Sequence, residues 1–311
     1  MEAEETDNSA PTPCRDIDIC AVVVTWQPDM DVLLALLDQL TAQACDVFVI
    51  DNGSANAETL DAAIAARARV TLKRWHENKG LAAAMNAGLQ LAQDKTYPFV
   101  FLFDQDSTLT DDFCAGMLDA WQRASVASAL PVAALGPRLQ NPVNARQTPF
   151  RLFRMLRRSD NQLGGIPDLF QADFLISSGC LFSRAALGSI GQMKESYFID
   201  NIDLEWCFRA RAKGFALVGT DSATLLHAIG EASNNPLVRA GWMVQHSPLR
   251  SYYSTRNRLH LYRQDYAPLN WKLRDCLRFA LKSLWLLLCS RQRREYLHQI
   301  RRGIRDSGDL I

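Results

Sequence analysis

Two periods of apolar residues alternate along the first hundred positions of the chain. Segments rich in apolar and β-branched residues, typical of strands, cover 17–26, 46–54, 69–77 and 97–103. Between them, apolar residues recur every three or four positions over 30–44, 58–68 and 78–94, which is typical of amphipathic helices. Strands and helices that alternate in this way predict an α/β fold with a mainly parallel sheet and right-handed crossovers.

The second half of the chain has a less regular pattern. We expect a strand over 132–139, a strand, turn and helix start over 174–187, a loop and helix over 197–215, and a strand pair over 215–231. Residues 140–170 have weak periodicity and many Pro, Asn, Gln and Arg residues, which predicts a long loop.

Two aspartates follow one of the most apolar of these runs. The segment FVFLF leads directly into Asp104 and Asp106, with Ser107 and Thr108 behind them. Such residues can simply form a turn or a helix cap. In a parallel α/β sheet, however, ligands bind beyond the carboxyl ends of the strands, and two carboxylates there can hold a hard divalent cation against a phosphate.

The composition indicates the size and the general class of the protein. The chain has 311 residues, 48% hydrophobic and 22% charged, enough for one large domain with or without an appendage. Its eight cysteines include no C-x-x-C pair, and those at 20, 45 and 180 lie in apolar or small-residue stretches. They are interpreted as reduced, buried thiols of a cytosolic protein. The first residues, MEAEETDNSAPTP, lack the features of a signal peptide and predict disorder over 1–15.

Charge is uneven although the formal net charge is zero. Residues 271–311 hold ten Lys and Arg against four Asp and Glu, a net of +6, which favours an anionic membrane surface as partner. We expect no nucleic-acid partner. The apolar stretch from Leu281 to Cys289, with Trp285, is too short to span a bilayer. Either a helix lying in the membrane interface or a helix pair packed on the body fits this pattern.

Four motifs occur in a specific order: VVVTW, VIDNGS, ENKGLAAAMNAGLQLA and FLFDQDS. Together they resemble the inverting glycosyltransferases of family 2, which have the GT-A fold. The later stretch DNIDLEWCFRARAKGF resembles the acidic helix motif of that family, with Ile202 where a glutamate is usual. The spellings DQDS and WCFRA, and the stretch RSYYSTRNRLHLYR at 250–263, are most similar to bacterial rhamnosyltransferases.

The resemblance implies a metal site at the end of the FVFLF run. Asp104 and Asp106 would meet the nucleotide diphosphate through Mg²⁺ or Mn²⁺, and His227 would complete the shell of the metal. Without the resemblance, His227 would be interpreted as a core histidine bonded to a backbone carbonyl.

A nucleotide-sugar site is implied beside it. Asp51 would accept a hydrogen bond from the imide N–H of the base, and Thr25 would contact the same nucleoside. Asn78 and Gly80 would let the backbone approach the nucleotide, and Asp104 would lie at its diphosphate. Turn formation alone is the alternative for Asp51 and for the N-K-G sequence.

The resemblance places the catalytic base at Asp203. A carboxylate close to a sugar hydroxyl can take its proton as the bond to the anomeric carbon forms, and direct displacement inverts that carbon. Glu205, two residues further on, is the second candidate. A helix N-cap is the structural alternative for Asp203.

The implied activity is transfer of L-rhamnose from dTDP-L-rhamnose to a lipid-linked saccharide acceptor in bacterial polysaccharide synthesis, at the cytoplasmic face of the inner membrane. Another donor, such as UDP-galactofuranose, is the alternative within this class. A sugar nucleotidyltransferase usually carries a glycine-rich phosphate loop, which VVVTWQPDM lacks, and three retained acidic positions disfavour a non-catalytic scaffold. We expect the transferase domain over 16–265 and a basic helical tail over 266–311.

Overall fold

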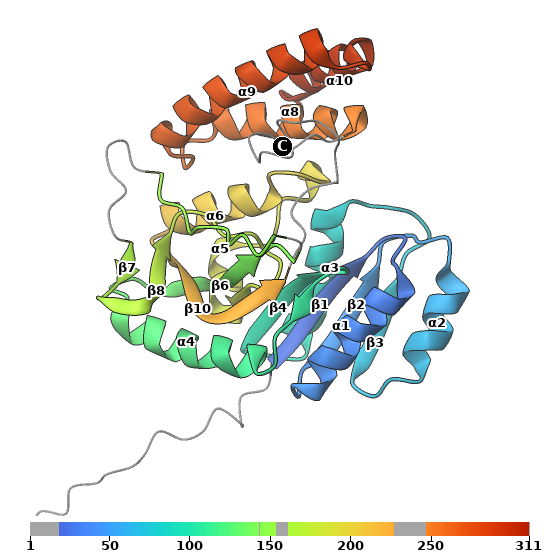
Figure 1. The fold of residues 1–311 in the computed structure, drawn as a ribbon, viewed down its shortest axis with the longest axis vertical. Coiled ribbons are helices and arrows are strands. Elements are labelled where there is room, and N and C mark those ends of the chain that lie inside the picture. The colour runs from blue at the N-terminus through green and yellow to red at the C-terminus, as the bar shows by residue number, and fades with distance from the viewer. Residues whose placement is uncertain (1–18, 143, 154–160, 227–246, 311) are drawn as a thin grey trace, which may run out of the picture.

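The computed structural model describes residues 19–142, 144–153, 161–226 and 247–310 (Figure 1). Its strands are β1 (Ile19–Thr25), β2 (Asp46–Asp51), β3 (Val70–Arg74), β4 (Phe99–Asp104), β5 (Thr108–Leu109), β6 (Val132–Gln140), β7 (Gln162–Leu163), β8 (Ile166–Ala172), β9 (Leu181–Ser183) and β10 (Ala216–Leu226). Its helices are α1 (Met30–Ala42), α2 (Ala57–Ala65), α3 (Leu81–Asp94), α4 (Phe113–Ala127), α5 (Arg184–Ile190), α6 (Ile202–Ala212), α8 (Pro248–Arg263), α9 (Leu269–Cys289) and α10 (Arg293–Asp306).

All of these strands belong to one sheet with the order β3-β2-β1-β4-β9-β6-β10-β8-β7, and β5 pairs with β10. The half from β3 to β4 is parallel, while β9 runs antiparallel between β4 and β6. The predicted α/β class with a mainly parallel sheet is therefore confirmed, and the strands before residue 105 lie close to their expected positions.

Side-chain alternation along β1 explains the two helical layers. Ile19, Ala21 and Val23 join the core under α1, α2 and α4, whereas the residues between them join the core under α3, α5 and α6. Because β1 is flanked by β2 and β4 and covered on both faces, every one of its residues is buried. This is why its sequence is an unbroken apolar run rather than an alternating one.

Two predictions for the second half were wrong. The loop expected over 140–170 contains β7 and most of β8, which form a hairpin, and β8 pairs with β10. Where a strand pair was expected over 215–231, the described residues form one strand, β10, whose pairing with β6 shifts register between Gly219 and Thr224; residues 227–231 lie outside the described part of the chain. A hairpin at the edge of a sheet has a weak pattern of apolar residues in its sequence, because few of its side chains are buried. In β8 only two residues are buried.

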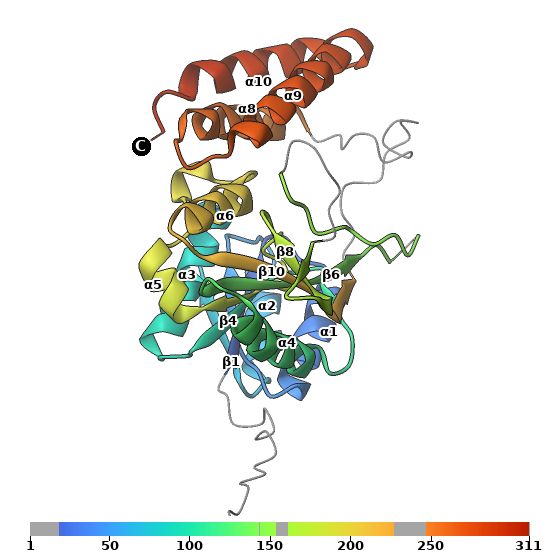
Figure 2. The same cartoon turned by 90° about the vertical axis from the view of Figure 1, so that its left-hand side faces the viewer.

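Helices α8, α9 and α10 form a separate layer beyond α6, on the side of the molecule away from α4 (Figures 1 and 2). Helix α10 packs closely on α8, and a Cβ at Gly303 would lie 2.7 Å from the carbonyl oxygen of Tyr252. Helix α9 is largely exposed, with Trp271 and Leu286 as its buried residues. Among the described residues, no helix combines the length and apolarity that crossing a membrane requires.

Candidate active site

The carboxyl ends of β2, β1 and β4 form the rim that carries the predicted site. Thr25 is paired with Asp51 across β1 and β2, and Val24 is paired with Asp104 across β1 and β4. Three residues predicted from separate motifs, Thr25, Asp51 and Asp104, therefore lie at one edge of the sheet. Parallel pairing produces this arrangement because all three strands end in the same direction.

The Asp51 side chain is fully buried, and its carboxylate accepts hydrogen bonds from nearby residues. Its Oδ1 accepts hydrogen bonds from the hydroxyls of Thr25, at 3.0 Å, and Ser54, and its Oδ2 accepts from the Ser54 backbone N–H at 3.1 Å. A carboxylate offers about four acceptor positions, so these three bonds orient the group and leave capacity for one more donor. The predicted turn role is therefore present, and it is compatible with recognition of a base.

Asn78 and Gly80 connect this turn to the start of α3. The Asn78 Oδ1 accepts from the Gly80 N–H at 2.9 Å and from the Asn52 side-chain amide at 3.0 Å. Gly53 and Gly80 both have positive φ, and added Cβ atoms would clash with the backbone of Glu77 and with Phe198. The two glycines thus allow the turn after β2 to lie against the backbone of Glu77, and the start of α3 to lie against Phe198.

Gln105 joins the end of β1 to the aspartate pair. The Trp26 N–H donates to Gln105 Oε1 at 2.7 Å, and Gln105 Nε2 donates to the Trp26 carbonyl at 3.2 Å. The Trp26 side chain is itself 53% exposed beside the rim. The middle residue of the D-Q-D sequence therefore fixes the backbone of β1 beside the aspartates.

Asp104 is half-buried and Asp106 is exposed at the rim. The Asp104 N–H donates to Ser178 Oγ at 3.3 Å, and the Ser178 hydroxyl contacts that of Ser107 at 3.0 Å. Two adjacent carboxylates offer the hard oxygen ligands that Mg²⁺ and Mn²⁺ prefer, so this pair fits a divalent ion.

A third metal ligand is not found within the described part of the chain, which contains no group of three metal-binding side chains. His227, predicted to complete the site, lies outside the described residues. The last described residue of β10, Leu226, pairs with Thr108, two positions from Asp106.

Asp203 lies in the first turn of α6, where the N-cap residue is Asn201. The helix-cap alternative for Asp203 was therefore wrong. The pKa of Asp203 is raised to about 6, chiefly by burial and also by the negative charges of Asp104 and Asp200, although hydrogen bonds from the Ser177 hydroxyl and N–H oppose the shift. A carboxyl group whose pKa approaches neutrality is suited to proton transfer.

Glu205, the second candidate base, is engaged in a structural ion pair. Its side chain is buried, both oxygens bind the Arg209 guanidinium at 2.8 Å, and Oε1 also accepts from the Tyr266 hydroxyl at 2.8 Å. Ile202, where the family pattern has a glutamate, is buried in the apolar core. These contacts leave Asp203 as the candidate base of the motif, and the negative charge of Asp104 acts on it.

The loop before Asp203 is held by α8. Phe198, Asp200 and Asn201 have positive φ, which is costly for residues other than glycine. The Arg250 guanidinium donates to both carboxylate oxygens of Asp200 at 2.9–3.2 Å. The side-chain amide nitrogen of Asn257 contacts three backbone carbonyls of the loop. The stretch 250–263, noted only for its resemblance, thus supports the backbone that leads to Asp203.

Sequence reasoning missed Ser177, Ser178 and Asn257. The first two belong to ISSGC, where small polar residues interrupt an apolar segment, and this interruption was the available signal. Asn257 carries no local signal, because its three carbonyl partners lie 57–60 residues away in the sequence.

Comparison with known proteins gives consistent results. The family model of glycosyl transferase family 2 matches residues 21–191. A curated relative, the dTDP-rhamnosyl transferase RfbF of Shigella flexneri, is 28% identical over 288 residues, which cover 90% of this chain and 92% of RfbF.

Solved structures share the fold. S. aureus TarS 1–349 in complex with UDP-GlcNAc has a TM-score of 0.58 and 12% identity, over 94% of this chain and 81% of that one. The chain spans only 50% of a longer TarS structure, with a TM-score of 0.56 and 12% identity over 95% of this chain. GalNAc-T7 with UDP, GalNAc and Mn²⁺ has a TM-score of 0.55 and 11% identity, over 93% of this chain and 56% of that one.

Proposed function

The chain belongs to glycosyltransferase family 2, and from that premise we propose that it moves L-rhamnose from dTDP-L-rhamnose to a hydroxyl of a lipid-linked saccharide, with inversion at the anomeric carbon. The observation that carries the chemistry is the position of Asp203, a carboxyl group near Asp104 with a pKa raised to about 6. Similarity to a dTDP-rhamnosyl transferase over nine-tenths of the chain supports the donor.

In this proposal Asp203 is the general base. Its carboxylate takes the proton of the acceptor hydroxyl while the hydroxyl oxygen bonds to the anomeric carbon and the bond from that carbon to the diphosphate breaks, which releases dTDP. Hydrogen bonds from Ser177 orient the carboxylate. Enzymes of the GT-A fold typically use a divalent metal, and we assign Asp104, Asp106 and His227 as its ligands. When bound, the ion would neutralise charge on the departing diphosphate.

The nucleoside is assigned to the other end of the rim. Asp51 would accept the imide N–H of thymine with the acceptor position that Thr25 and Ser54 leave open. Asn78 and Gly80 would line the nucleotide from the start of α3. UDP-galactofuranose remains the alternative donor, because uracil presents the same imide group. Membership of the family supports a transferase over the sugar nucleotidyltransferase and scaffold interpretations.

We assign the enzyme to the cytoplasmic face of the inner membrane, held there by α9. Six leucines line the outer side of this helix and are 55–67% exposed; we call them the leucine face: Leu269, Leu273, Leu277, Leu281, Leu284 and Leu288. Their spacing of three or four positions places them on one side of the helix. Contiguous exposed apolar surface of this kind marks a membrane or protein contact.

Charge favours the membrane over a second copy of the chain. Arg274 and Arg278 each directly follow a leucine of the leucine face in the sequence, Arg291 lies just beyond α9, and all three are exposed. Two such faces placed together would bring like charges into contact, whereas an anionic lipid surface attracts them, at about 1 kcal/mol for each basic residue near it.

A donor screen tests the proposal. Purified full-length protein would be incubated with an acceptor and with dTDP-L-rhamnose, UDP-galactofuranose or a GDP-sugar, and release of the nucleotide would be measured. We expect turnover only with dTDP-L-rhamnose, and tighter binding of dTDP than of UDP by calorimetry. Tighter binding of UDP, with transfer from UDP-galactofuranose, would assign the protein to the alternative donor.

A further inference from the structure

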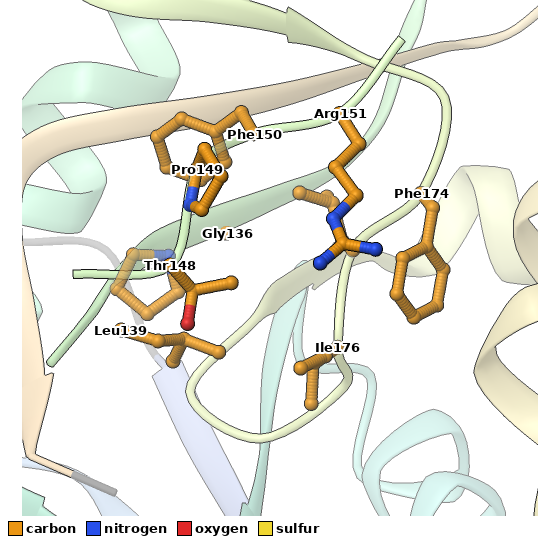
Figure 3. Close-up of a pocket in the computed structure, with 10 residues that line it drawn as sticks. Gly136, Leu139, Thr148, Pro149, Phe150, Arg151, Phe174 and Ile176 are labelled. Atoms are coloured by element: carbon orange, nitrogen blue, oxygen red, sulfur yellow. The ribbon is translucent and has the colours of Figure 1, made fainter. Parts of the chain in front are cut away.

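An apolar pocket of about 230 Å³ lies between the end of β6 and the segment that leads to Ser177. Leu139, Pro149, Phe150, Phe174 and Ile176 form much of its wall, and Arg151 also lines it (Figure 3). Ile176 directly precedes Ser177, which hydrogen-bonds Asp203. The pocket is therefore one residue along the chain from the partner of the proposed base.

Packing fixes the backbone that presents Arg151. Phe150 fills the space over Gly219, where an added Cβ would lie 2.3 Å from its ring, and it stacks on Phe170 with centroids 5.4 Å apart. The Arg138 guanidinium covers the Phe150 ring at 4.2 Å. The carbonyl of Arg151 itself accepts from the Asp173 N–H at 2.9 Å. With both sides anchored, the Arg151 side chain projects into the pocket toward Phe174 (Figure 3).

The charge of Arg151 has no carboxylate partner in the described part of the chain. Most of the other residues that line the pocket are apolar, and Arg151 itself is exposed, so that solvent and a ligand can reach it. Burial, together with the positive charge of Arg278 on α9, lowers the pKa of Arg151. Because a guanidinium remains protonated in proteins, an anion that enters the pocket would be stabilised by the positive charge of Arg151.

We propose that this pocket binds a phosphate group of the acceptor, with Arg151 as its cation and the apolar wall in contact with the first part of the lipid. The proposal rests on the proposed lipid-linked acceptor and identifies where the acceptor is recognised. A guanidinium matches phosphate oxygens in a bidentate manner, and an apolar wall suits a prenyl chain better than a sugar.

Calorimetry on the full-length protein, saturated with dTDP, separates the possible ligands. A short-chain prenyl diphosphate, inorganic pyrophosphate and the neutral prenol would each be titrated. We expect the prenyl diphosphate to bind most tightly, and Arg151→Gln to weaken it about 10- to 100-fold, as expected for the loss of a charged hydrogen bond. Arg146→Gln, which removes an exposed arginine of the same segment, is the matched control and should leave binding unchanged.

Two results would overturn the pocket assignment: equal affinity for pyrophosphate and prenyl diphosphate, or unchanged affinity after Arg151→Gln in a variant that still binds dTDP. Since binding needs no turnover, these results are independent of the donor screen. With active enzyme, Arg151→Gln should raise KM for a diphosphate-linked acceptor about 10- to 100-fold while KM for an alkyl glycoside without phosphate stays the same. An equal rise for both acceptors would contradict phosphate recognition.

Discussion

The side-chain amide of Asn257 lies 2.9 Å from the carbonyl oxygen of Asp200, three residues before the proposed base. The same nitrogen lies 2.8 Å from the carbonyl oxygens of Tyr197 and Ile199. One side chain of α8 thus gathers three carbonyls of a loop in which Asp200 has positive φ. The layer of C-terminal helices is therefore part of the machinery that positions Asp203.

Replacing Asn257 with alanine should loosen this loop. We expect kcat to fall about 10²-fold, because a misplacement of about 1 Å can cost that much, while dTDP affinity stays near normal since the nucleotide rim lies on other strands. Steady-state kinetics and calorimetry would measure the two effects. An unchanged kcat in a folded Asn257→Ala variant would show that the contact is not needed to position Asp203.

Asp203→Asn keeps the size of the side chain and one acceptor oxygen but cannot accept a proton. We expect transfer to fall about 10²- to 10⁴-fold, the usual contribution of general base catalysis, with nucleotide and metal binding retained. Single-turnover kinetics would measure the loss.

Glu205→Gln is the control for this assignment. It breaks a buried ion pair with Arg209, so we expect a loss of about 3–5 kcal/mol of stability and near-normal kcat in whatever fraction folds. If a folded Glu205→Gln enzyme is inactive and Asp203→Asn is active, the base is Glu205.

The raised pKa of Asp203 also predicts a dependence of stability on pH. Its ordinary value is 3.8 and its value here is about 6, so the native carboxyl holds its proton more firmly than the unfolded one. The stability that this group contributes is present below about pH 4 and is lost as pH rises through 6. In metal-free buffer, Asp203→Asn should therefore stabilise the protein at pH 7.5, by at most about 3 kcal/mol, with the gain vanishing near pH 4. Denaturant titrations at both pH values would measure it; an equal gain at both would contradict the shift.

Removal of metal should stop transfer. We expect EDTA to abolish activity and Mg²⁺ or Mn²⁺ to restore it, because the diphosphate carries charge that Asp104 and Asp106 alone would repel. Asp106→Ala should lose most activity and weaken nucleotide binding measured in the presence of metal. Full activity in EDTA would refute the metal assignment.

The leucine face should bind anionic vesicles. Substituting both Leu277 and Leu284 with asparagine should abolish most vesicle binding without lowering Tm, since both side chains are exposed. Co-sedimentation would measure binding, which should weaken as salt is raised. Val126→Asn on α4, where the valine is 90% exposed, is the matched control. Unchanged binding of the double variant would assign the leucine face to a protein contact.

The first half of the fold, and the position of Thr25, Asp51 and Asp104 at one edge of the sheet, could be predicted from the amino-acid sequence. Strands β1, β2 and β4 are buried on both faces, so their apolar runs are unbroken and easy to locate. Once these strands are parallel, their carboxyl ends must meet, and the side chains of Thr25, Asp51 and Asp104 follow. The local pattern of apolar residues was sufficient for these strands, because the burial of each strand shows directly in its own sequence.

The other features depend on contacts between segments that are distant in the sequence. The hairpin of β7 and β8 lies at a sheet edge, where few buried residues leave a pattern. The roles of Asp203 and Glu205 depend on Arg209, Tyr266 and Ser177, which come together only in the folded chain. The support that Asn257 gives to the loop joins residues 57–60 positions apart. Arg151, which the sequence places in a long loop, acquires its pocket from the end of β6 and from the segment around Phe174. A hydrogen bond between distant residues leaves no periodic trace in either of them, because its geometry is set by how the layers pack.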